Sequence, residues 1–123
     1  MDQRTVLVVE DDDETQNLLR ALLRRHGAAV QMAEDGERAI ELLRVAEFDT
    51  VILDLMLPKR NGFEVAGALF TLERRPKLIV VSSLARHFAD RFPDGTVMLQ
   101  KPFDIDQLDA AITNTSTPAP RFL

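Results

Sequence analysis

Short apolar runs alternate along the chain with longer segments in which apolar residues recur every three or four positions. The runs are rich in β-branched residues, which is typical of strands buried on both faces of a sheet. They predict five strands, at residues 6–9, 29–33, 50–55, 78–82 and 97–100. The periodic segments predict five helices, marked by apolar positions within residues 18–23, 39–46, 63–72, 84–92 and 105–112.

Residues near the ends of these segments predict local details. Asp13 and Gln16 have the spacing of a capping box at the start of the first helix. The dipeptide Asn61-Gly62 is interpreted as a turn in the loop before the third helix. A leucine stripe in the first helix is expected to face the sheet, with one or two members exposed; it comprises Leu18, Leu19, Leu22 and Leu23.

The alternation of strands and helices predicts an α/β fold, with a parallel sheet covered by helices on both faces. A chain of 123 residues is the length of one domain. We place this domain at residues 1–113 and interpret the polar, proline-containing residues 114–123 as a flexible tail or linker. Ligands of such sheets bind beyond the carboxyl ends of the strands, so we expect the chemistry there.

Composition and charge narrow the classes of function. The chain has 46% hydrophobic and 28% charged residues, as soluble globular domains do. Its formal net charge of −5 argues against direct binding of nucleic acid or of an anionic membrane, because both are negatively charged. The absence of cysteine excludes a disulfide scaffold, a thiolate metal site and a cysteine nucleophile. No apolar run has the length of a membrane span or a signal peptide, so we expect a cytoplasmic location.

Polar residues lie at the carboxyl ends of four of the predicted strands, and they are Glu10, Asp11, Asp54, Ser82 and Lys101. If the sheet is doubly wound, the carboxyl ends of its central strands lie close together, which places these side chains in one pocket. Three carboxylates at close range repel one another, and a divalent cation relieves that repulsion. Ligands that are all oxygen favour Mg²⁺, with Mn²⁺ as the alternative, over zinc.

The same set supplies what phosphoryl transfer requires, which is mainly positioning and neutralisation of charge. Mg²⁺ often takes a phosphate as a further ligand. Asp54, the acidic residue nearest the centre of the predicted sheet, is the candidate nucleophile for an aspartyl phosphate. Ser82 could donate a hydrogen bond to one phosphoryl oxygen, and the ammonium group of Lys101 could neutralise another.

Five segments carry these residues in a specific order and spacing: Val8-Val9-Glu10-Asp11-Asp12, Ile52-Leu53-Asp54-Leu55-Met56-Leu57-Pro58, Asn61-Gly62, Val81-Ser82-Ser83 and Leu99-Gln100-Lys101-Pro102-Phe103. Together they resemble the receiver domain of two-component response regulators, of the stand-alone or kinase-associated type. The resemblance covers about residues 4–113. It implies a doubly wound, flavodoxin-like fold with five parallel strands in the order 2-1-3-4-5.

The resemblance implies that Asp54 accepts a phosphoryl group from a histidine kinase or phosphotransfer protein. The modified domain would then change its interaction with an unknown downstream protein. Ser82 and Lys101 would contact the phosphoryl group, and the bond between Lys101 and Pro102 would be cis. The domain would catalyse its own phosphotransfer and slow autodephosphorylation at most, and is not expected to be a metabolic enzyme.

The resemblance also implies a set of Mg²⁺ ligands. Asp11 and Asp54 would bind the metal directly, and Glu10 would reach it through water. The backbone carbonyl of Met56, two residues after the acceptor, would be a further ligand.

The chain departs from the family pattern at three positions. Receivers commonly have Tyr or Phe three residues before the lysine, where this chain has Met98, which has no aromatic ring to rotate. Two positions that govern self-dephosphorylation in the family are Met56 and Leu84, and neither side chain can orient a water molecule. We therefore predict a long-lived phosphoryl group.

Three other functions compete with this interpretation. A pseudo-receiver would keep the fold and act as an interaction module without phosphorylation. A phosphatase or mutase that works through aspartyl phosphate would need a second carboxylate where Met56 stands. A flavin or nucleotide carrier would need a phosphate-binding loop after the first strand, where Glu10 and Asp11 would instead repel a phosphate. The oligomeric state is left open.

Overall fold

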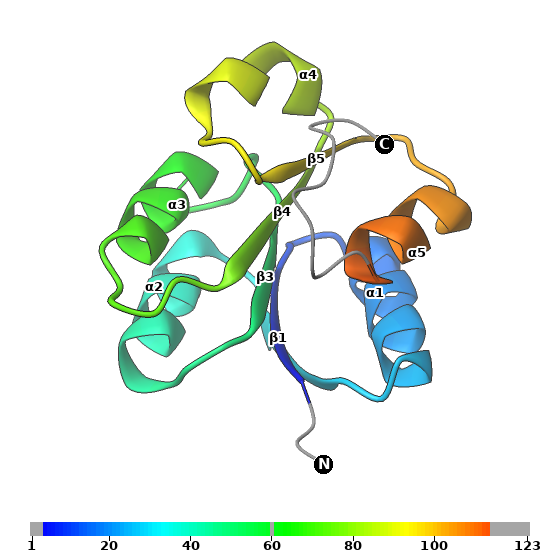
Figure 1. Cartoon of the computed structure of the whole chain (residues 1–123), viewed down its shortest axis with the longest axis horizontal. Helices are drawn as coiled ribbons and strands as arrows, with labels where there is room; N and C mark the ends of the chain where they lie inside the picture. Colours follow the sequence, from blue (N-terminus) through cyan, green and yellow to red (C-terminus); the bar gives the residue numbers. More distant parts are fainter. Residues whose placement is uncertain (1–3, 60, 114–123) are drawn as a thin grey trace.

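Five parallel strands form one sheet in the computed structural model, which describes residues 4–59 and 61–113. The spatial order is β2-β1-β3-β4-β5, which confirms the predicted topology. Figure 1 labels β1, β3, β4 and β5 in this order. The strands are β1 (Thr5–Val9), β2 (Ala29–Ala33), β3 (Thr50–Leu53), β4 (Lys77–Ser82) and β5 (Val97–Gln100). The predicted tail at 114–123 and residues 1–3 of the predicted domain lie outside the described residues.

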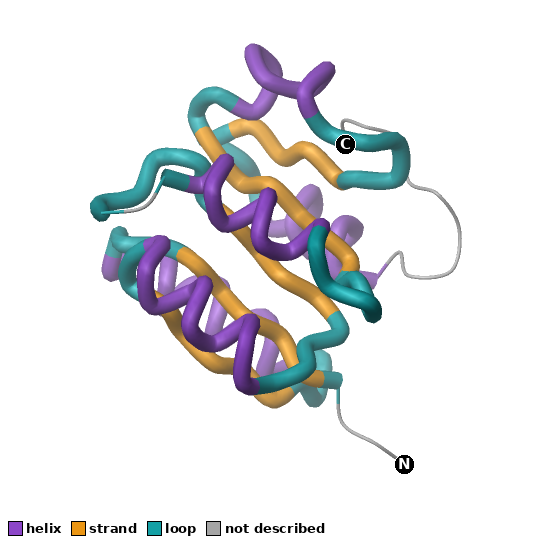
Figure 2. The backbone as a smooth tube through the Cα atoms, turned by 90° about the vertical axis from the view of Figure 1, so that its left-hand side faces the viewer, coloured by secondary structure: helices purple, strands orange, loops and turns teal. Residues whose placement is uncertain are grey.

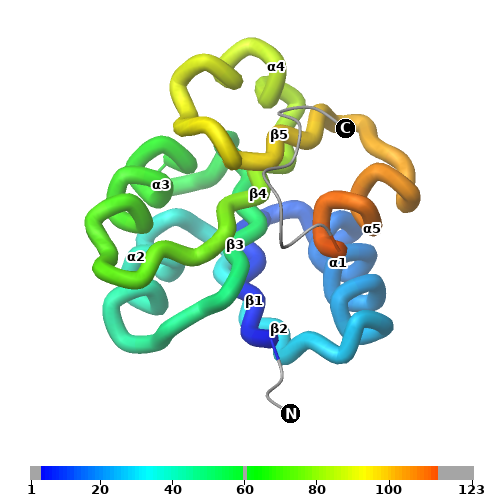
Figure 3. Tube along the Cα trace, in the orientation of Figure 1, coloured from blue at the N-terminus to red at the C-terminus, as the bar shows by residue number. Residues whose placement is uncertain are grey.

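Helices cover both faces of this sheet, as the alternating pattern predicts. Helices α1 (Asp13–Arg25) and α5 (Ile105–Thr113) lie side by side on one face (Figures 1 and 3). Helices α2 (Gly36–Val45) and α3 (Gly62–Phe70) cover the other face, in front of the sheet in Figure 2. Among the described residues, no helix is both long enough and apolar enough to cross a membrane.

The fourth helical segment is short and lies beyond strand β5 (Figure 3). The stretch predicted as one helix over 84–92 divides into α4 (Ala85–Phe88) and a 3₁₀ turn, η1 (Ala89–Arg91). Aromatic contacts connect this segment to α3. The ring centroids of Phe63 and Phe88 are 4.9 Å apart and those of Phe63 and Phe92 are 5.8 Å apart, distances at which aromatic rings attract.

The core consists of two layers, one on each side of the sheet. Alternate residues of a strand point to opposite faces, so Val8 packs under α1 and α5 while Leu7 and Val9 pack under α2 and α3. Strands β1 and β3 are buried on both faces, which explains their continuous apolar sequence. The leucine stripe of α1 faces the sheet except for Leu18, which is exposed.

Strand register brings the ends of β1 and β3 to the same level. Val9 pairs with Leu53, and the backbone N–H of Asp54 donates to the carbonyl of Val9 at 3.0 Å. Strand β3 therefore ends at Leu53, two residues earlier than predicted. Glu10 and Asp54 therefore directly follow adjacent strands at the same end of the sheet.

The predicted capping box at Asp13 is wrong, because Asp12 occupies the N-cap position of α1. The Asp12 carboxylate accepts from the backbone N–H of Thr15 at 2.9 Å and from the Thr15 hydroxyl at 2.7 Å. These bonds lower the pKa of Asp12. The side chain of Gln16 turns instead to the backbone carbonyl of Glu10, 2.5 Å away, and so ties the first turn of α1 to the end of β1.

Candidate functional site

Three carboxylates meet where β1 and β3 end. One oxygen from each of Glu10, Asp11 and Asp54 lies within 4.8 Å of the other two. Glu10 is only 2% exposed and Asp54 only 7%, whereas Asp11 is exposed. Oxygen donors at this spacing, buried on one side and open on the other, can hold a hard divalent cation.

The ammonium group of Lys101 lies against the two buried carboxylates. Its Nζ donates to Glu10 Oε1 at 2.8 Å and to Asp54 Oδ2 at 3.1 Å. Lys101 follows directly after β5, and its peptide bond to Pro102 is cis, as the family resemblance implies. A buried carboxylate pair without such a cation would be strongly unfavourable.

The pKa values of this pair depend on burial and on mutual contact. Burial raises the pKa of Glu10, and the neighbouring charge of Asp54 raises it further, against the lowering effect of the bond from Lys101. Burial also disfavours the charged form of Lys101, but hydrogen bonds from its ammonium group to Glu10 and Asp54 outweigh burial and raise its pKa. Lys101 therefore stays charged beside the two carboxylates.

Backbone donors fix the orientation of the two buried carboxylates. Asp54 Oδ1 accepts from the N–H of Met56 at 3.0 Å, which leaves Oδ2 for Lys101. Glu10 Oε2 accepts from the N–H of Asp12 at 3.2 Å. Each acid is thus held from two sides, a geometry that prepares one defined face of the carboxylate for an incoming group.

Ser82 ends β4 and is completely buried. Its hydroxyl accepts a hydrogen bond from the backbone N–H of Leu84 at 3.2 Å, so it is engaged within its own loop. Its backbone carbonyl accepts from the N–H of Lys101 at 3.0 Å. The fold therefore places Ser82 beside the strand that carries Lys101, while its side chain bonds to Leu84 rather than to the carboxylates.

Gly62 belongs to the architecture of this site, although the sequence indicated only a turn. A methyl group added at Gly62 would lie 2.4 Å from the Cα of Leu55 and 2.7 Å from the carbonyl oxygen of Asp54. The preceding Asn61 caps α3 by accepting from the N–H of Glu64 at 3.0 Å. Asn61-Gly62 thus starts a helix and lets it approach the backbone of Asp54 and Leu55 closely, which only glycine permits.

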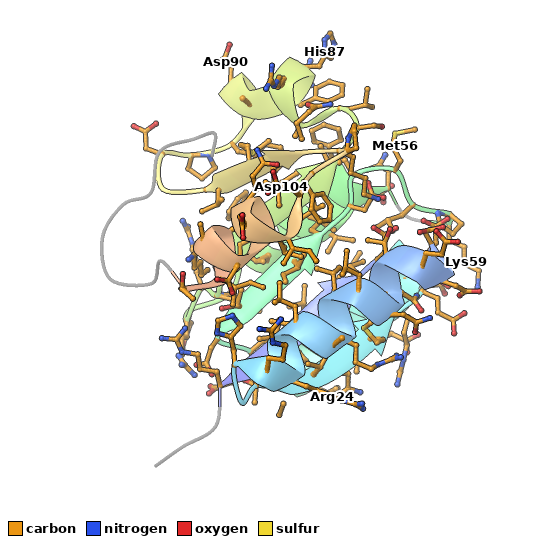
Figure 4. The ribbon with its side chains drawn as sticks, turned by 90° about the vertical axis from the view of Figure 1, so that its right-hand side faces the viewer. Arg24, Met56, Lys59, His87, Asp90 and Asp104 are labelled. Atoms are coloured by element: carbon orange, nitrogen blue, oxygen red, sulfur yellow. The ribbon has the colours of Figure 1, made fainter. Side chains whose placement is uncertain are left out.

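The two positions that govern self-dephosphorylation in the family carry apolar side chains that solvent can reach. Met56 is 56% exposed and Leu84 is partly exposed. Met56 and Lys59 lie at the end of the molecule where α1 begins (Figure 4). Met98, where the family commonly has an aromatic ring, is completely buried within the core.

The sequence matches known proteins along most of its length. The family model of the response regulator receiver domain matches residues 6–113. The chain is 33% identical over 119 residues to response regulator MprA of Mycolicibacterium vanbaalenii, a match that covers 92% of this chain and 52% of that protein. It is 33% identical to the transcriptional regulatory protein PdtaR of Mycobacterium tuberculosis, covering 89% of this chain and 55% of that protein. The chain thus spans about half the length of these relatives.

A solved structure with a similar fold supports the same assignment. The response regulator TrrA of Thermotoga maritima, in complex with Mg²⁺ and BeF, is 27% identical, with a TM-score of 0.80 over 92% of this chain and 99% of that one. The cluster of Glu10, Asp11 and Asp54 fits the metal site of a receiver domain. Because the family model covers residues 6–113, the chain belongs to the response regulator receiver domain family.

Proposed function

We propose that this receiver domain is a phosphorylation switch in two-component signalling, with Asp54 as the acceptor. The donor is the phospho-histidine of a histidine kinase or phosphotransfer protein, and Mg²⁺ is required. The observation that carries this proposal is the buried pair Glu10–Asp54, bridged by Lys101 beside Asp11. A purely structural ion pair would not require a third carboxylate at the same opening.

The charges and donor atoms of the site fit Mg²⁺. Three carboxylates and one ammonium carry two more negative than positive charges, which one divalent cation balances. Asp11 and Asp54 would ligate the ion directly, Glu10 would hold one of its waters, and the backbone carbonyl of Met56 would be a further ligand. When bound, Mg²⁺ supplies neutralisation of charge on the transferring phosphoryl oxygens. Mn²⁺ satisfies the same oxygen donors.

In the transfer step an oxygen of Asp54 attacks the phosphorus atom. A P–O bond to Asp54 forms as the P–N bond to the donor histidine breaks, and the electron pair of that bond returns to the imidazole nitrogen. Lys101 lies 3.1 Å from Asp54 Oδ2 and would follow the developing negative charge onto a phosphoryl oxygen. Ser82 would leave its bond with Leu84, and its hydroxyl would donate a hydrogen bond to another phosphoryl oxygen.

The aspartyl phosphate should be long-lived. Met56 and Leu84 stand at the positions from which a polar side chain would orient an attacking water, and neither can form that hydrogen bond. We expect inorganic phosphate to be released from the purified phosphoprotein over minutes or longer. Release that is complete within seconds in Mg²⁺ buffer would contradict this prediction.

Intact mass after incubation with acetyl phosphate tests the acceptor. Wild-type protein with Mg²⁺ should gain one phosphoryl group, and Asp54→Asn should gain none. Asp90→Asn, which changes an exposed aspartate in η1, is the matched control and should behave as wild type.

Removal of the metal tests the second part of the proposal. The gain should disappear in excess chelator and return with Mg²⁺ or Mn²⁺. If the wild type gains nothing from acetyl phosphate or from a panel of phosphorylated histidine kinases, the pseudo-receiver becomes the better interpretation.

A further inference from the structure

The side chain of Gln100 forms three hydrogen bonds at the end of β5. Its Oε1 accepts from the backbone N–H of Arg86 at 2.8 Å. Its Nε2 donates to the carbonyl of Ser83 at 2.5 Å and to the carbonyl of Lys101 at 3.2 Å. One amide therefore connects the residue after Ser82, the first turn of α4 and the backbone of Lys101.

This contact gives α4 a cap that its own sequence does not provide. Leu84 occupies the N-cap position, and its apolar side chain cannot accept from the first-turn N–H groups. Gln100 Oε1 does so from the neighbouring strand, at Arg86. A helix of a single turn has few internal hydrogen bonds, so an external acceptor of this kind has a large effect on its position.

The bonded groups flank the part of the loop that Ser82 would have to move. Ser82 pairs with Gln100 in the register of β4 and β5, and its hydroxyl is bonded to Leu84 N–H. Leu84 lies between Ser83 and Arg86, the two residues of this loop that Gln100 holds. If Ser82 turns toward a phosphoryl group on Asp54, Leu84 N–H loses its acceptor, and the loop between the two Gln100 bonds must rearrange.

Gln100 also lies on the same side of the sheet as Met98, the position where receivers commonly have an aromatic residue. Met98 and Gln100 are two residues apart on β5, so their side chains share a face. Met98 is completely buried in the core under α2 and α3 and has no polar group that could sense the loop. Gln100 directly precedes Lys101. Its side-chain amide already forms hydrogen bonds with Ser83 and Arg86 in the loop after β4.

From this placement we infer that Gln100 is the positioning residue that transmits the state of the acceptor site to helix α4. Its amide holds α4 and the Ser83 carbonyl in the resting form, and its bonds to both break when Ser82 moves. The inference rests on the proposed phosphorylation of Asp54. It names the route of the response, which in this chain runs through a hydrogen-bonding amide rather than an aromatic side chain.

Hydrogen exchange of the Arg86 amide, followed by NMR, tests this route. The probe is Mg²⁺ with beryllofluoride, which mimics a phosphoryl group on a carboxylate. The variant is Gln100→Met, which keeps the length of the side chain and removes all three bonds. The matched control is Gln31→Met, at an exposed position of edge strand β2.

In the wild type, the probe should accelerate exchange at Arg86 by about tenfold, as expected for loss of one hydrogen bond. In Gln100→Met exchange should already be about tenfold faster without the probe, and the probe should add less than twofold. Gln31→Met should match the wild type. If the probe still accelerates exchange in Gln100→Met by about tenfold, as in the wild type, Gln100 has a structural role only and the inference is overturned.

A second comparison separates failure of this inference from failure of the proposed function. If the probe shifts the resonances of Asp54 and Lys101 in the wild type but leaves Arg86 exchange unchanged, the route through Gln100 is wrong and the switch stands. If neither beryllofluoride nor acetyl phosphate affects the wild type, the proposed function fails and this inference fails with it.

Discussion

At the scale of single residues, the site depends on how Lys101 compensates two buried acids. Glu10 and Asp54 are buried at the end of adjacent strands, and the ammonium group contacts both. Removing one member of a buried ionic group costs more than the group itself contributes, because an uncompensated charge stays behind. The arrangement therefore links the stability of the resting protein to the same atoms that would carry its chemistry.

Replacing Lys101 with methionine should destabilise the metal-free protein by about 3 kcal/mol, the cost of leaving a buried charge without its partner. Mg²⁺ should restore part of this loss and should raise the melting temperature of the variant more than that of the wild type. Urea unfolding with and without Mg²⁺ measures both effects. Lys59→Met is the control, because the Lys59 side chain is 63% exposed and its ammonium group lies 3.5 Å from Asp35, so the change should cost less than about 1 kcal/mol.

Four residues of the site could be predicted from sequence because each interrupts or follows an apolar strand, and these are Glu10, Asp11, Asp54 and Lys101. Gln100 and Gly62 could not be predicted in this way. Gln100 stands out because it contacts a loop 14 to 17 residues earlier in the chain. Gly62 stands out because its backbone lies very close to that of Leu55. Neither contact leaves a periodic or compositional signal in the chain.

At the scale of elements, helix α3 packs closely against the loop that follows Asp54. Asn61 caps its first turn, and Gly62 lies against the backbone of Asp54 and Leu55. The same helix carries Phe63, which packs on α4 and η1. Helix α3 therefore contacts both the residues that follow β3 and the segment formed by α4 and η1.

Gly62→Ala should destabilise the fold by about 1–3 kcal/mol, because the new methyl group would lie 2.4 Å from the Cα of Leu55 and neither backbone can easily yield. It should also slow phosphorylation of Asp54 by acetyl phosphate, since the loop after the acceptor must shift. Thermal unfolding and intact mass measure the two effects.

Gly67→Ala is the matched control for this prediction. Gly67 is exposed in the same helix, and an added methyl group would meet nothing within 4 Å. Alanine should stabilise the helix there by about 0.5–1 kcal/mol. Equal effects of the two substitutions would show that close approach at Gly62 is unimportant.

The existence, order and type of the elements follow from hydrophobic pattern, because period and length distinguish the buried strands from the amphipathic helices. The ends of the elements were harder to place. Asp12 and Asp13 are both good caps, and the choice of Asp12 depends on Thr15. The fourth helix divides at Ala89, which is buried with Phe92 in the core, and no local pattern marks this division.

At the scale of the whole molecule, each end of the sheet carries an acidic residue, and the pKa values of the two are shifted in opposite directions. At the carboxyl ends of the strands, burial raises the pKa of Glu10. At the opposite end, the backbone N–H of Thr5 donates to Asp49 at 2.8 Å and, with contacts from Arg74, lowers the pKa of Asp49. The pKa of a carboxyl is thus raised at one end of the sheet by burial and lowered at the other end by hydrogen bonds.

These two acids should give opposite dependences of unfolding free energy on pH. The folded state binds the Glu10 proton more tightly than the unfolded chain, so this contribution to stability is present below the unfolded pKa and is lost as pH rises through the folded pKa. For Asp49 the contribution is present above the unfolded pKa and is lost as pH falls through the folded pKa. In chelator, Glu10→Gln should therefore gain stability relative to wild type at neutral pH, and Asp49→Asn should lose it.

Chemical unfolding at a series of pH values from about 3 to 7 tests this difference. Both substitutions should have smaller effects at the acidic end, where Glu10 is protonated in both states and the unfolded chain protonates Asp49. The double variant should show the sum of the single effects, because the two sites share no partner. Parallel pH profiles for the two single variants would contradict the assignment.

Helix α4 is one turn long and depends on a glutamine from another strand, whereas the strands beneath it are buried on both faces. Short surface segments of this kind open far more often than the molecule unfolds. The domain can therefore change its outer surface while the sheet stays intact, and a binding partner would select among openings that already occur. The rate of signalling would then depend on how long helix α4 stays closed, and not on the barrier to unfolding of the core.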